Sequence, residues 1–135
     1  KKMQAIDIVS KYYQAFNDKN WRGMIELVDE NIQHDANQGS TNIGIEAFKY
    51  FLQNMDFSYD EKLTEIVLLS EPTNTRIAAE FIVNGTYLQT DKGLPVAKGQ
   101  KYVLPAGSFL EVKNGKITRV TTYYNLELWI QLISQ

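Results

Sequence analysis

The period of the hydrophobic pattern changes near residue 60, and this change constrains the fold more than any other feature of the 135-residue sequence. Before this point, apolar residues recur at the spacing of amphipathic helices, as Ile6, Val9, Tyr13 and Phe16 do. After it, apolar and polar residues alternate as they do in half-buried strands. Helices first and strands afterwards indicate an α+β fold in which the helices pack on one face of an antiparallel sheet.

Caps and turn residues set the expected boundaries of the elements. Asn20 is a helix-capping residue, and Asn114-Gly115 is the strongest hairpin turn signal in the chain. We expect helices over residues 3–17 and 21–28, a third helix after Gly44, strands over residues 31–35, 62–70, 76–87, 101–112 and 116–124, and a short C-terminal helix over residues 126–134. The length is typical of one domain and no linker interrupts it, so we expect a single domain over residues 1–135.

The Asn-Gly turn also predicts the register of the last two strands. A two-residue loop pairs Phe109 with Val120 and Gly107 with Thr122, and residues opposite one another share a face. This register places Gly107, Phe109, Val120, Thr122 and Tyr124 on one face, while the other face is also substantially apolar. Because the helices cover only one face, we expect the other face to contact a second copy of the chain in a homodimer.

Composition excludes several classes of function. The net charge is −2, so no basic surface for nucleic acid is expected. The absence of Cys and the single His exclude thiolate chemistry and a zinc site built on His and Cys. No phosphate-binding loop or zinc-protease motif occurs, and we expect neither a metal nor a cofactor. No apolar run is long enough to span a membrane and no signal-peptide pattern is present, so we expect a cytoplasmic protein without a membrane partner.

Two adjacent residues are candidates for proton transfer. Asp35 lies at the end of a predicted strand, where partial desolvation at the rim of an apolar pocket would raise its pKa and favour a role as general base. The alternative is that Asp35 caps the following turn. His34 is the only imidazole and can exchange a proton near neutral pH, or it can be a hydrogen-bonded structural residue. The stripe that contains Phe48, Phe51 and Met55 is core, and part of it would line any cavity.

Three segments of the sequence resemble a known group of proteins. They are HDANQG at residues 34–39, GTYLQTDKGLPVAKGQ at 85–100 and GKITRVTTYYN at 115–125. These segments are similar to the ketosteroid isomerase-related proteins of the SnoaL-like group, within the superfamily named after nuclear transport factor 2 (NTF2). The resemblance covers nearly the whole chain. It implies a cone-shaped α+β barrel, in which three N-terminal helices pack on a curved antiparallel sheet around an apolar pocket.

The resemblance also implies roles for individual residues. In ketosteroid isomerases a carboxylate base moves a proton between two carbons beside a carbonyl, while a tyrosine and a protonated aspartic acid stabilise the enolate oxygen. Asp35 would match the base and Tyr12 the tyrosine. Gly107 stands where the second acid is expected, and Asn125 stands where related cyclases carry an acid. Loss of one oxyanion donor typically slows a reaction by about a hundredfold or more, which argues against efficient steroid isomerisation.

The resulting hypothesis is an isomerase-like enzyme that transfers protons on a small apolar carbonyl compound of steroid or polyketide type, with Asp35, Tyr12 and His34 as catalytic residues. The alternatives are a non-catalytic protein that binds a hydrophobic small molecule and a partner-binding module like that of the transport-factor branch. The residues expected to line the pocket are Phe16, Asn37, Phe48, Phe51, Met55, Phe81, Gly107, Phe109, Val120, Thr122 and Tyr124.

Overall fold

A computed structural model describes residues 3–36 and 39–135 of the chain. The helices are α1 (Ala5–Asn17), α2 (Trp21–Leu27), α3 (Ile45–Ser58) and α4 (Leu126–Ile133), and the strands are β1 (Val28–Ala36), β2 (Thr41–Ile43), β3 (Tyr59–Ser70), β4 (Arg76–Tyr87), β5 (Lys101–Lys113) and β6 (Lys116–Tyr124). The α+β class is confirmed. The short, fully exposed strand β2 was not predicted, because three exposed residues carry no readable alternation.

Side-chain caps begin two of the helices where the sequence places amide side chains. The Asn20 side chain accepts a hydrogen bond from the backbone N–H of Gly23 at 3.0 Å, which satisfies one of the free donors at the start of α2. Asn125 caps α4 in the same way, through the N–H of Leu128 at 3.0 Å. Asn125 therefore has a structural role at the position where the resemblance implies an acid.

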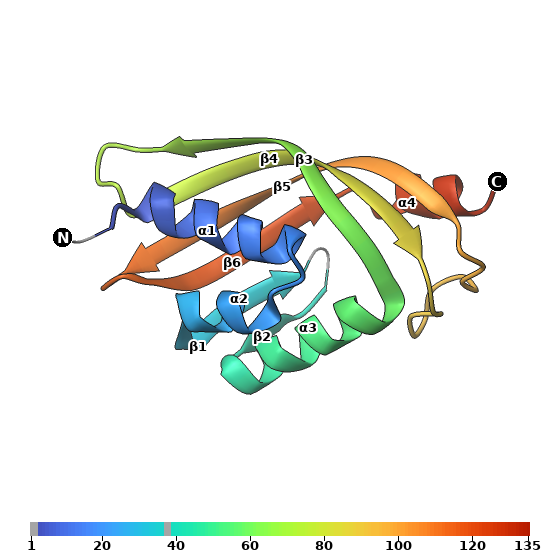
Figure 1. Cartoon of the computed structure of the whole chain (residues 1–135), viewed down its shortest axis with the longest axis horizontal. Coiled ribbons are helices and arrows are strands. Elements are labelled where there is room, and N and C mark those ends of the chain that lie inside the picture. The colour runs from blue at the N-terminus through green and yellow to red at the C-terminus, as the bar shows by residue number, and fades with distance from the viewer. Residues whose placement is uncertain (1–2, 37–38) are drawn as a thin grey trace.

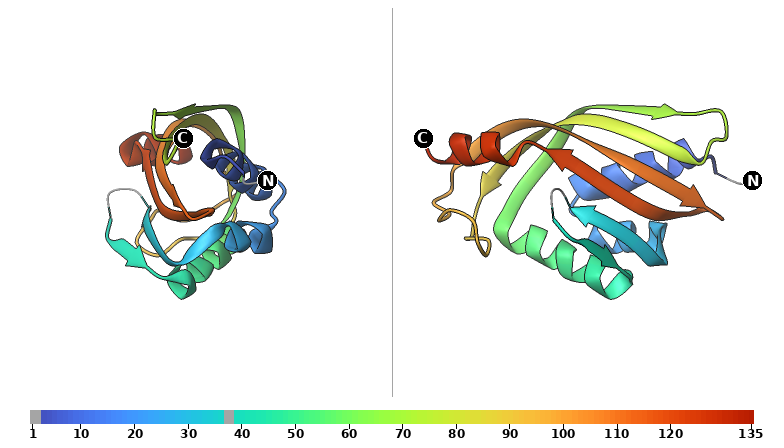
Figure 2. Two further views of the ribbon diagram at one scale, coloured as in Figure 1. Left: turned by 90° about the vertical axis from the view of Figure 1, so that its left-hand side faces the viewer. Right: turned by 180° about the vertical axis from the view of Figure 1, so that it is seen from behind.

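The six strands form one curved, unclosed sheet in the order β2-β1-β6-β5-β4-β3. The pairs are antiparallel except β1 and β6, which run parallel, so the sheet is mixed and not wholly antiparallel as expected. Helices α1, α2 and α3 lie inside and below the curve of the sheet (Figure 1). Seen along the long axis, the strands curl around the interior, and α4 lies near one end of the molecule (Figure 2).

A β-bulge in β6 corrects the predicted hairpin register. Val112 lies opposite Ile117, but the next residue of β5, Glu111, lies opposite Arg119, so Thr118 is an extra residue in β6. Beyond the bulge the pairing is shifted by one position. Because side chains alternate between faces, this shift turns the even-numbered residues of β6 beyond the bulge, such as Val120 and Thr122, to the concave face, which they share with the even-numbered residues of β5. The odd-numbered residues of β5, which include Gly107 and Phe109, face outward.

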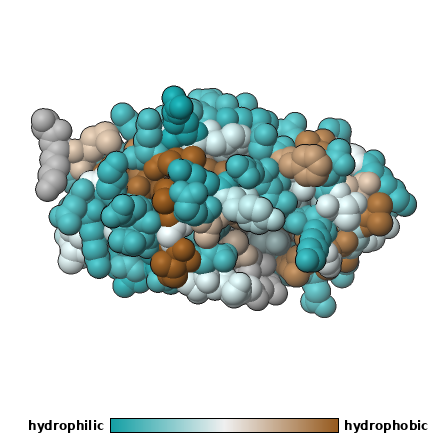
Figure 3. All heavy atoms as spheres, turned by 90° about the horizontal axis from the view of Figure 1, so that it is seen from below, coloured by the Kyte–Doolittle hydropathy of each residue, from teal (hydrophilic) through white to brown (hydrophobic). Residues whose placement is uncertain are grey.

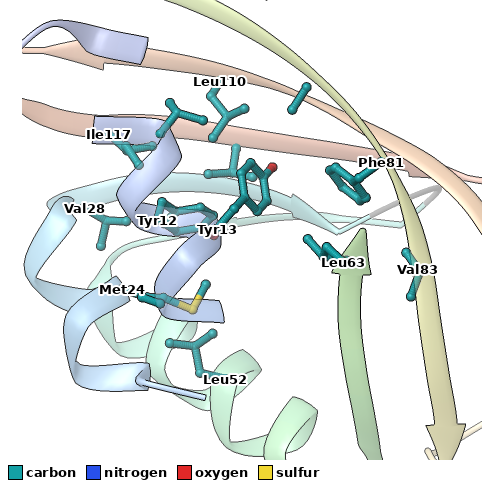
Figure 4. Packing of buried hydrophobic residues seen from close by; sticks show 14 of the residues in the cluster. Tyr12, Tyr13, Met24, Val28, Leu52, Leu63, Phe81, Val83, Leu110 and Ile117 are labelled. Carbon is teal, nitrogen blue, oxygen red and sulfur yellow. The ribbon is translucent and has the colours of Figure 1, made fainter. Parts of the chain in front are cut away.

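One part of the hydrophobic core lies between α1 and the sheet, toward the β5–β6 turn, and another surrounds Trp129 of α4. Tyr12 and Tyr13 project inward from α1, and Leu110 and Ile117 project toward them from the sheet (Figure 4). Phe48 and Leu52 of α3 add further fully buried side chains, and burial of each stabilises the fold by roughly 1.5–3 kcal/mol. Among the described residues, none of the helices has the length and apolar character needed to cross a bilayer.

Candidate functional site

A cavity of about 330 Å³ lies beyond this core, between the concave face of the sheet and helices α1 and α3. Its volume is within the range of small-molecule sites, which are concave and mainly apolar with a few polar groups. Every helix and every strand except β2 contributes to its wall, together with Asp91 and Leu94 from the loop after β4. Seen from below, the outer surface is mainly hydrophilic, with separate hydrophobic groups (Figure 3).

Most of the residues predicted from the sequence are on the cavity wall. Those that line it are Tyr12, Phe16, His34, Phe51, Met55, Phe81, Val120, Thr122 and Tyr124. Asn37 lies outside the described residues. Asp35, Phe48, Gly107 and Phe109 do not line the cavity, and these four placements are corrected by the structure.

Two different causes remove Phe48 and Phe109 from the wall. Phe48 is fully buried behind the wall, where its ring lies 5.4 Å from the His34 ring and 6.4 Å from the Tyr12 ring between centroids. Phe109 is 50% exposed on the outer face of the sheet, because the bulge in β6 pairs the inward-facing Val120 with Leu110 and not with Phe109. Gly107 faces outward for the same reason, since Thr122 pairs with Ser108.

Asp35 also points away from the cavity. Its neighbour His34 faces inward, and alternation along β1 directs Asp35 to the outer face. There its Oδ2 accepts hydrogen bonds from Thr121 at 2.6 Å and from Gln33 at 3.1 Å. Burial by itself would raise the pKa of the Asp35 carboxyl, but these hydrogen bonds and the positive charge of Arg119 hold the pKa below its usual value. The prediction that Asp35 is a base at the pocket is therefore wrong in its geometry.

His34 is the titratable group of the pair that reaches the cavity. Its side chain is 3% exposed, and its ring packs 4.3 Å from the Phe51 ring, between centroids. Among the described residues, its Nδ1 atom has no hydrogen-bond partner. Burial lowers the pKa of His34 to about 4, against a smaller opposing effect of the Asp35 charge. The imidazole is consequently neutral at pH 7, with one ring nitrogen able to accept a proton.

Hydroxyl groups surround the same part of the cavity. Tyr12 and Tyr13 pack edge to face at 5.2 Å, and burial raises the pKa of both phenols, which keeps them protonated as donors. The Ser108 and Thr122 hydroxyls are 2.9 Å apart on the facing strands β5 and β6. Ser108 is the inward neighbour of Gly107. A hydroxyl group therefore occupies the inward position of β5 nearest to where the resemblance leads us to expect a second acid.

A second set of polar groups lines the cavity and was missed in the sequence. Glu61 on β3 accepts a hydrogen bond from the hydroxyl of Tyr102 on β5. The carboxylate of Asp91 accepts hydrogen bonds from the hydroxyl of Tyr59 at 2.8 Å and from the Asn54 side chain at 3.3 Å. Strand β3 begins at Tyr59, three residues earlier than the predicted start at residue 62.

One sequence signal could have revealed the contact between Glu61 and Tyr102. Gly85 interrupts the otherwise apolar alternation of β4, and a glycine inside a strand often marks a close approach of another group. Among the described residues, no group of three or more His, Asp or Glu side chains is arranged to hold a metal ion.

Solved structures similar to the chain include two proteins that carry the name "putative polyketide cyclase". One, from Pseudomonas putida KT2440, is 44% identical, with 97% of this chain and 98% of that chain covered and a TM-score of 0.96. The other, from Xanthomonas campestris, is 49% identical, with 96% of each chain covered and a TM-score of 0.92. No curated protein matches the sequence.

More distant structures share only the fold. An NTF2-like protein of Burkholderia pseudomallei K96243 is 14% identical, with 97% of this chain and 98% of that chain covered and a TM-score of 0.81. This similarity confirms the cone-shaped NTF2-like fold that the resemblance implies. The model of the SnoaL-like domain family matches residues 9–120, which is most of the sequence. The chain therefore belongs to the SnoaL-like family.

Proposed function

We propose that the protein is an isomerase- or cyclase-like enzyme that transfers protons on a small, largely apolar carbonyl compound bound in the cavity. The observation that carries this proposal is the position of His34, a buried and neutral imidazole, on an otherwise mainly apolar wall. The proposal assigns the proton-transfer role to His34 and not to Asp35, because Asp35 is outside the cavity.

The proposed reaction needs no group beyond the side chains of the wall. The neutral imidazole removes a proton from a carbon next to the carbonyl, the electron pair of that C–H bond forms a carbon–carbon double bond, and the π pair of the carbonyl moves onto its oxygen. The resulting enolate accepts a hydrogen bond from the Tyr12 hydroxyl. The imidazolium then returns the proton to another carbon of the conjugated system, which restores the neutral ring. The negative enolate favours the imidazolium, which burial otherwise disfavours.

The hydroxyls of Ser108 and Thr122 support a modest catalyst of this kind. They offer neutral donors where ketosteroid isomerases have a protonated acid, and neutral hydrogen bonds are weaker than those of more acidic groups. The names of the two similar polyketide cyclase structures agree with a substrate that is a polyketide-like carbonyl compound. A protein that only binds such a compound is the remaining alternative.

The test compares the turnover rates of variants at residues that line the cavity with that of a variant at Asp35, which lies on the outer face of β1. Wild type, His34→Gln, Tyr12→Phe and Asp35→Asn are compared on a panel of unsaturated ketones, by absorbance for double-bond migration and by NMR for exchange of carbon-bound hydrogen with D2O. We expect His34→Gln and Tyr12→Phe each to lower the rate by about a hundredfold or more, since each removes a proton-transfer or oxyanion group.

Asp35→Asn is the matched control, and it should keep the wild-type rate within a few fold. A large loss in Asp35→Asn, in a protein whose melting temperature is unchanged, would return the base to Asp35 and contradict the proposal. If all four proteins bind a hydrophobic ligand but none turns over any ketone, the protein is a binding protein and the catalytic proposal fails.

A further inference from the structure

We propose that Glu61 is the residue that anchors the ligand at the end of the cavity opposite His34, and that it selects molecules with an O–H or N–H donor at that end. The inference rests on the proposed use of the cavity as a small-molecule site, and it adds the chemical class of the ligand. The evidence is the way in which the fold holds this carboxyl group and leaves one of its oxygens open.

The fold holds the carboxyl group by a contact that crosses a whole strand. Glu61 of β3 lies opposite Gly85 of β4, which lies opposite Tyr102 of β5. The Tyr102 side chain lies over Gly85, where a Cβ atom would overlap its phenol ring, and donates its hydroxyl hydrogen bond to Oε2 of Glu61. The absence of a side chain at position 85 thus permits a tyrosine to orient a carboxyl group two strands away.

One oxygen of this carboxyl group is left without a partner. Among the described residues, Oε1 of Glu61 makes no hydrogen bond, whereas Oε2 has that of Tyr102. Lys19, whose charge acts on Glu61, is engaged with Asp60 at 2.7 Å. Burial raises the pKa of Glu61 above its usual value, although Tyr102 and Lys19 oppose this rise. Oε1 is not among the fully buried atoms without a partner, so it is open to the cavity, where a ligand that supplies a donor gains a hydrogen bond to the carboxyl group.

The position of Glu61 separates its role from proton transfer. Across the sheet, His34 pairs with Val120, which pairs with Leu110 of β5. Glu61 is connected through Gly85 to Tyr102 of β5, eight positions away from Leu110. The β5 residues that line the cavity, Leu104, Ala106 and Ser108, lie between Tyr102 and Leu110, so His34 and Glu61 flank this stretch of the wall from opposite sides. A base and an oxyanion donor act on atoms a few ångströms apart, so Glu61 contacts a different part of the ligand from His34.

A second carboxylate on the cavity wall strengthens the preference for a ligand that donates a hydrogen bond. Asp91 already accepts hydrogen bonds from Tyr59 and Asn54, and no Lys or Arg lines the cavity within the described residues. The wall therefore repels anions and offers them no positive partner. The ligand class that fits is an apolar molecule whose far end is a hydroxyl or an amine, and carboxylates are excluded.

The test uses naphthalene probes that differ in a single substituent. The probes are 2-naphthol, 2-(aminomethyl)naphthalene, 2-methylnaphthalene and 2-naphthoate, and their Kd values are measured by displacement of a fluorescent hydrophobic dye. We expect 2-naphthol or the amine to bind at least about fivefold more tightly than 2-methylnaphthalene, and 2-naphthoate at least about tenfold more weakly than 2-naphthol. The comparison of the naphthol with the amine shows which donor Glu61 takes.

Variants of Glu61 and Tyr102 test whether the carboxyl group causes this selectivity. Glu61→Gln should reduce the preference for 2-naphthol over 2-naphthoate by at least about fivefold, because it removes the charge at nearly constant size. Tyr102→Phe should reduce it too, by releasing the carboxyl group. Glu80→Gln is the matched control, since Glu80 is exposed on the outer face of β4.

Three outcomes would overturn the inference: equal selectivity in wild type and Glu61→Gln, tight binding of 2-naphthoate by wild type, or no binding of any probe. The last would also remove the proposed small-molecule site. Absence of ketone turnover together with intact donor selectivity would contradict only the catalytic proposal, so the two failures are distinguishable.

Discussion

His34 is held in an aromatic environment that penalises its protonation, and this has a consequence for stability as well as for chemistry. The pKa of the folded protein's imidazole is about 4, whereas the ordinary value is 6.5. The unfolded chain therefore binds a proton on this residue at a higher pH than the folded chain does. Stability is present in full above pH 6.5 and is lost as the pH falls toward 4, by about 3 kcal/mol at most.

Urea unfolding at several pH values between 7 and 4 measures this effect. Wild type should lose about 2–3 kcal/mol more stability over this range than His34→Gln, which has no imidazole to protonate. The carboxyl groups titrate in both proteins and cancel in the comparison. If stability changed with pH in the same way in both proteins, folding would not lower the pKa of His34.

At the scale of the elements, Gly85 is a position where β4 leaves no room for a side chain. A methyl group there would meet the ring of Tyr102, which is itself buried against Trp129 at 5.9 Å between ring centroids. We expect Gly85→Ala to lower the free energy of unfolding by about 1–3 kcal/mol, the usual cost of overpacking. Chemical denaturation measures the change directly.

The Tyr102→Ala background is the control for this strand. With the ring removed, Gly85→Ala should be neutral or slightly stabilising, because alanine loses less backbone entropy than glycine on folding. An equal destabilisation in both backgrounds would mean that the backbone of β4, and not the tyrosine, requires glycine at position 85.

The elements differ in how far the sequence could predict them. Strand β4 runs from Arg76 to Tyr87 as expected, since a turn and a loop bound it on both sides. The start of β3 was missed because Tyr59 and Glu61 follow directly on the helical pattern of α3, with no turn residue between them. That missed boundary is why the Glu61 end of the cavity was not predicted.

The candidate site was predictable in its composition but not in its orientation. A period of two assigns His34 and Asp35 to opposite faces without deciding which of them is inside. The packing of His34 against Phe48 and Phe51 decides this, and those contacts come from a helix that is distant in the sequence. The bulge at Thr118 is likewise invisible locally, because no residue type requires it.

At the scale of the whole molecule, the outer face of the sheet is a candidate for self-association. Val103, Phe109 and Tyr123 are each at least half exposed there, and the rings of Phe109 and Tyr123 are 5.9 Å apart between centroids. Exposed apolar side chains gathered on one face are typical of interaction sites. We expect the protein to form a homodimer through this face.

Size-exclusion chromatography with light scattering tests this expectation. Wild type should have the mass of two chains, and Phe109→Lys should shift it toward one chain, because a charge would be buried at the contact. Phe57→Lys is the matched control, since Phe57 is 66% exposed on α3. A wild type that has the mass of a single chain at micromolar concentration would contradict the expected homodimer.

The extra residue in β6 also affects how relatives of this chain should be compared. Between the Asn114-Gly115 turn and the bulge, the odd-numbered Ile117 of β6 points into the molecule, whereas beyond the bulge the even-numbered Val120 and Thr122 do. A relative that lacked the equivalent of Thr118 would keep the pairs Glu111–Arg119 and Leu110–Val120, so it would carry the same side chains toward its ligand. An alignment that omitted this one-residue gap would therefore exchange inside for outside along the rest of β6, without a single substitution.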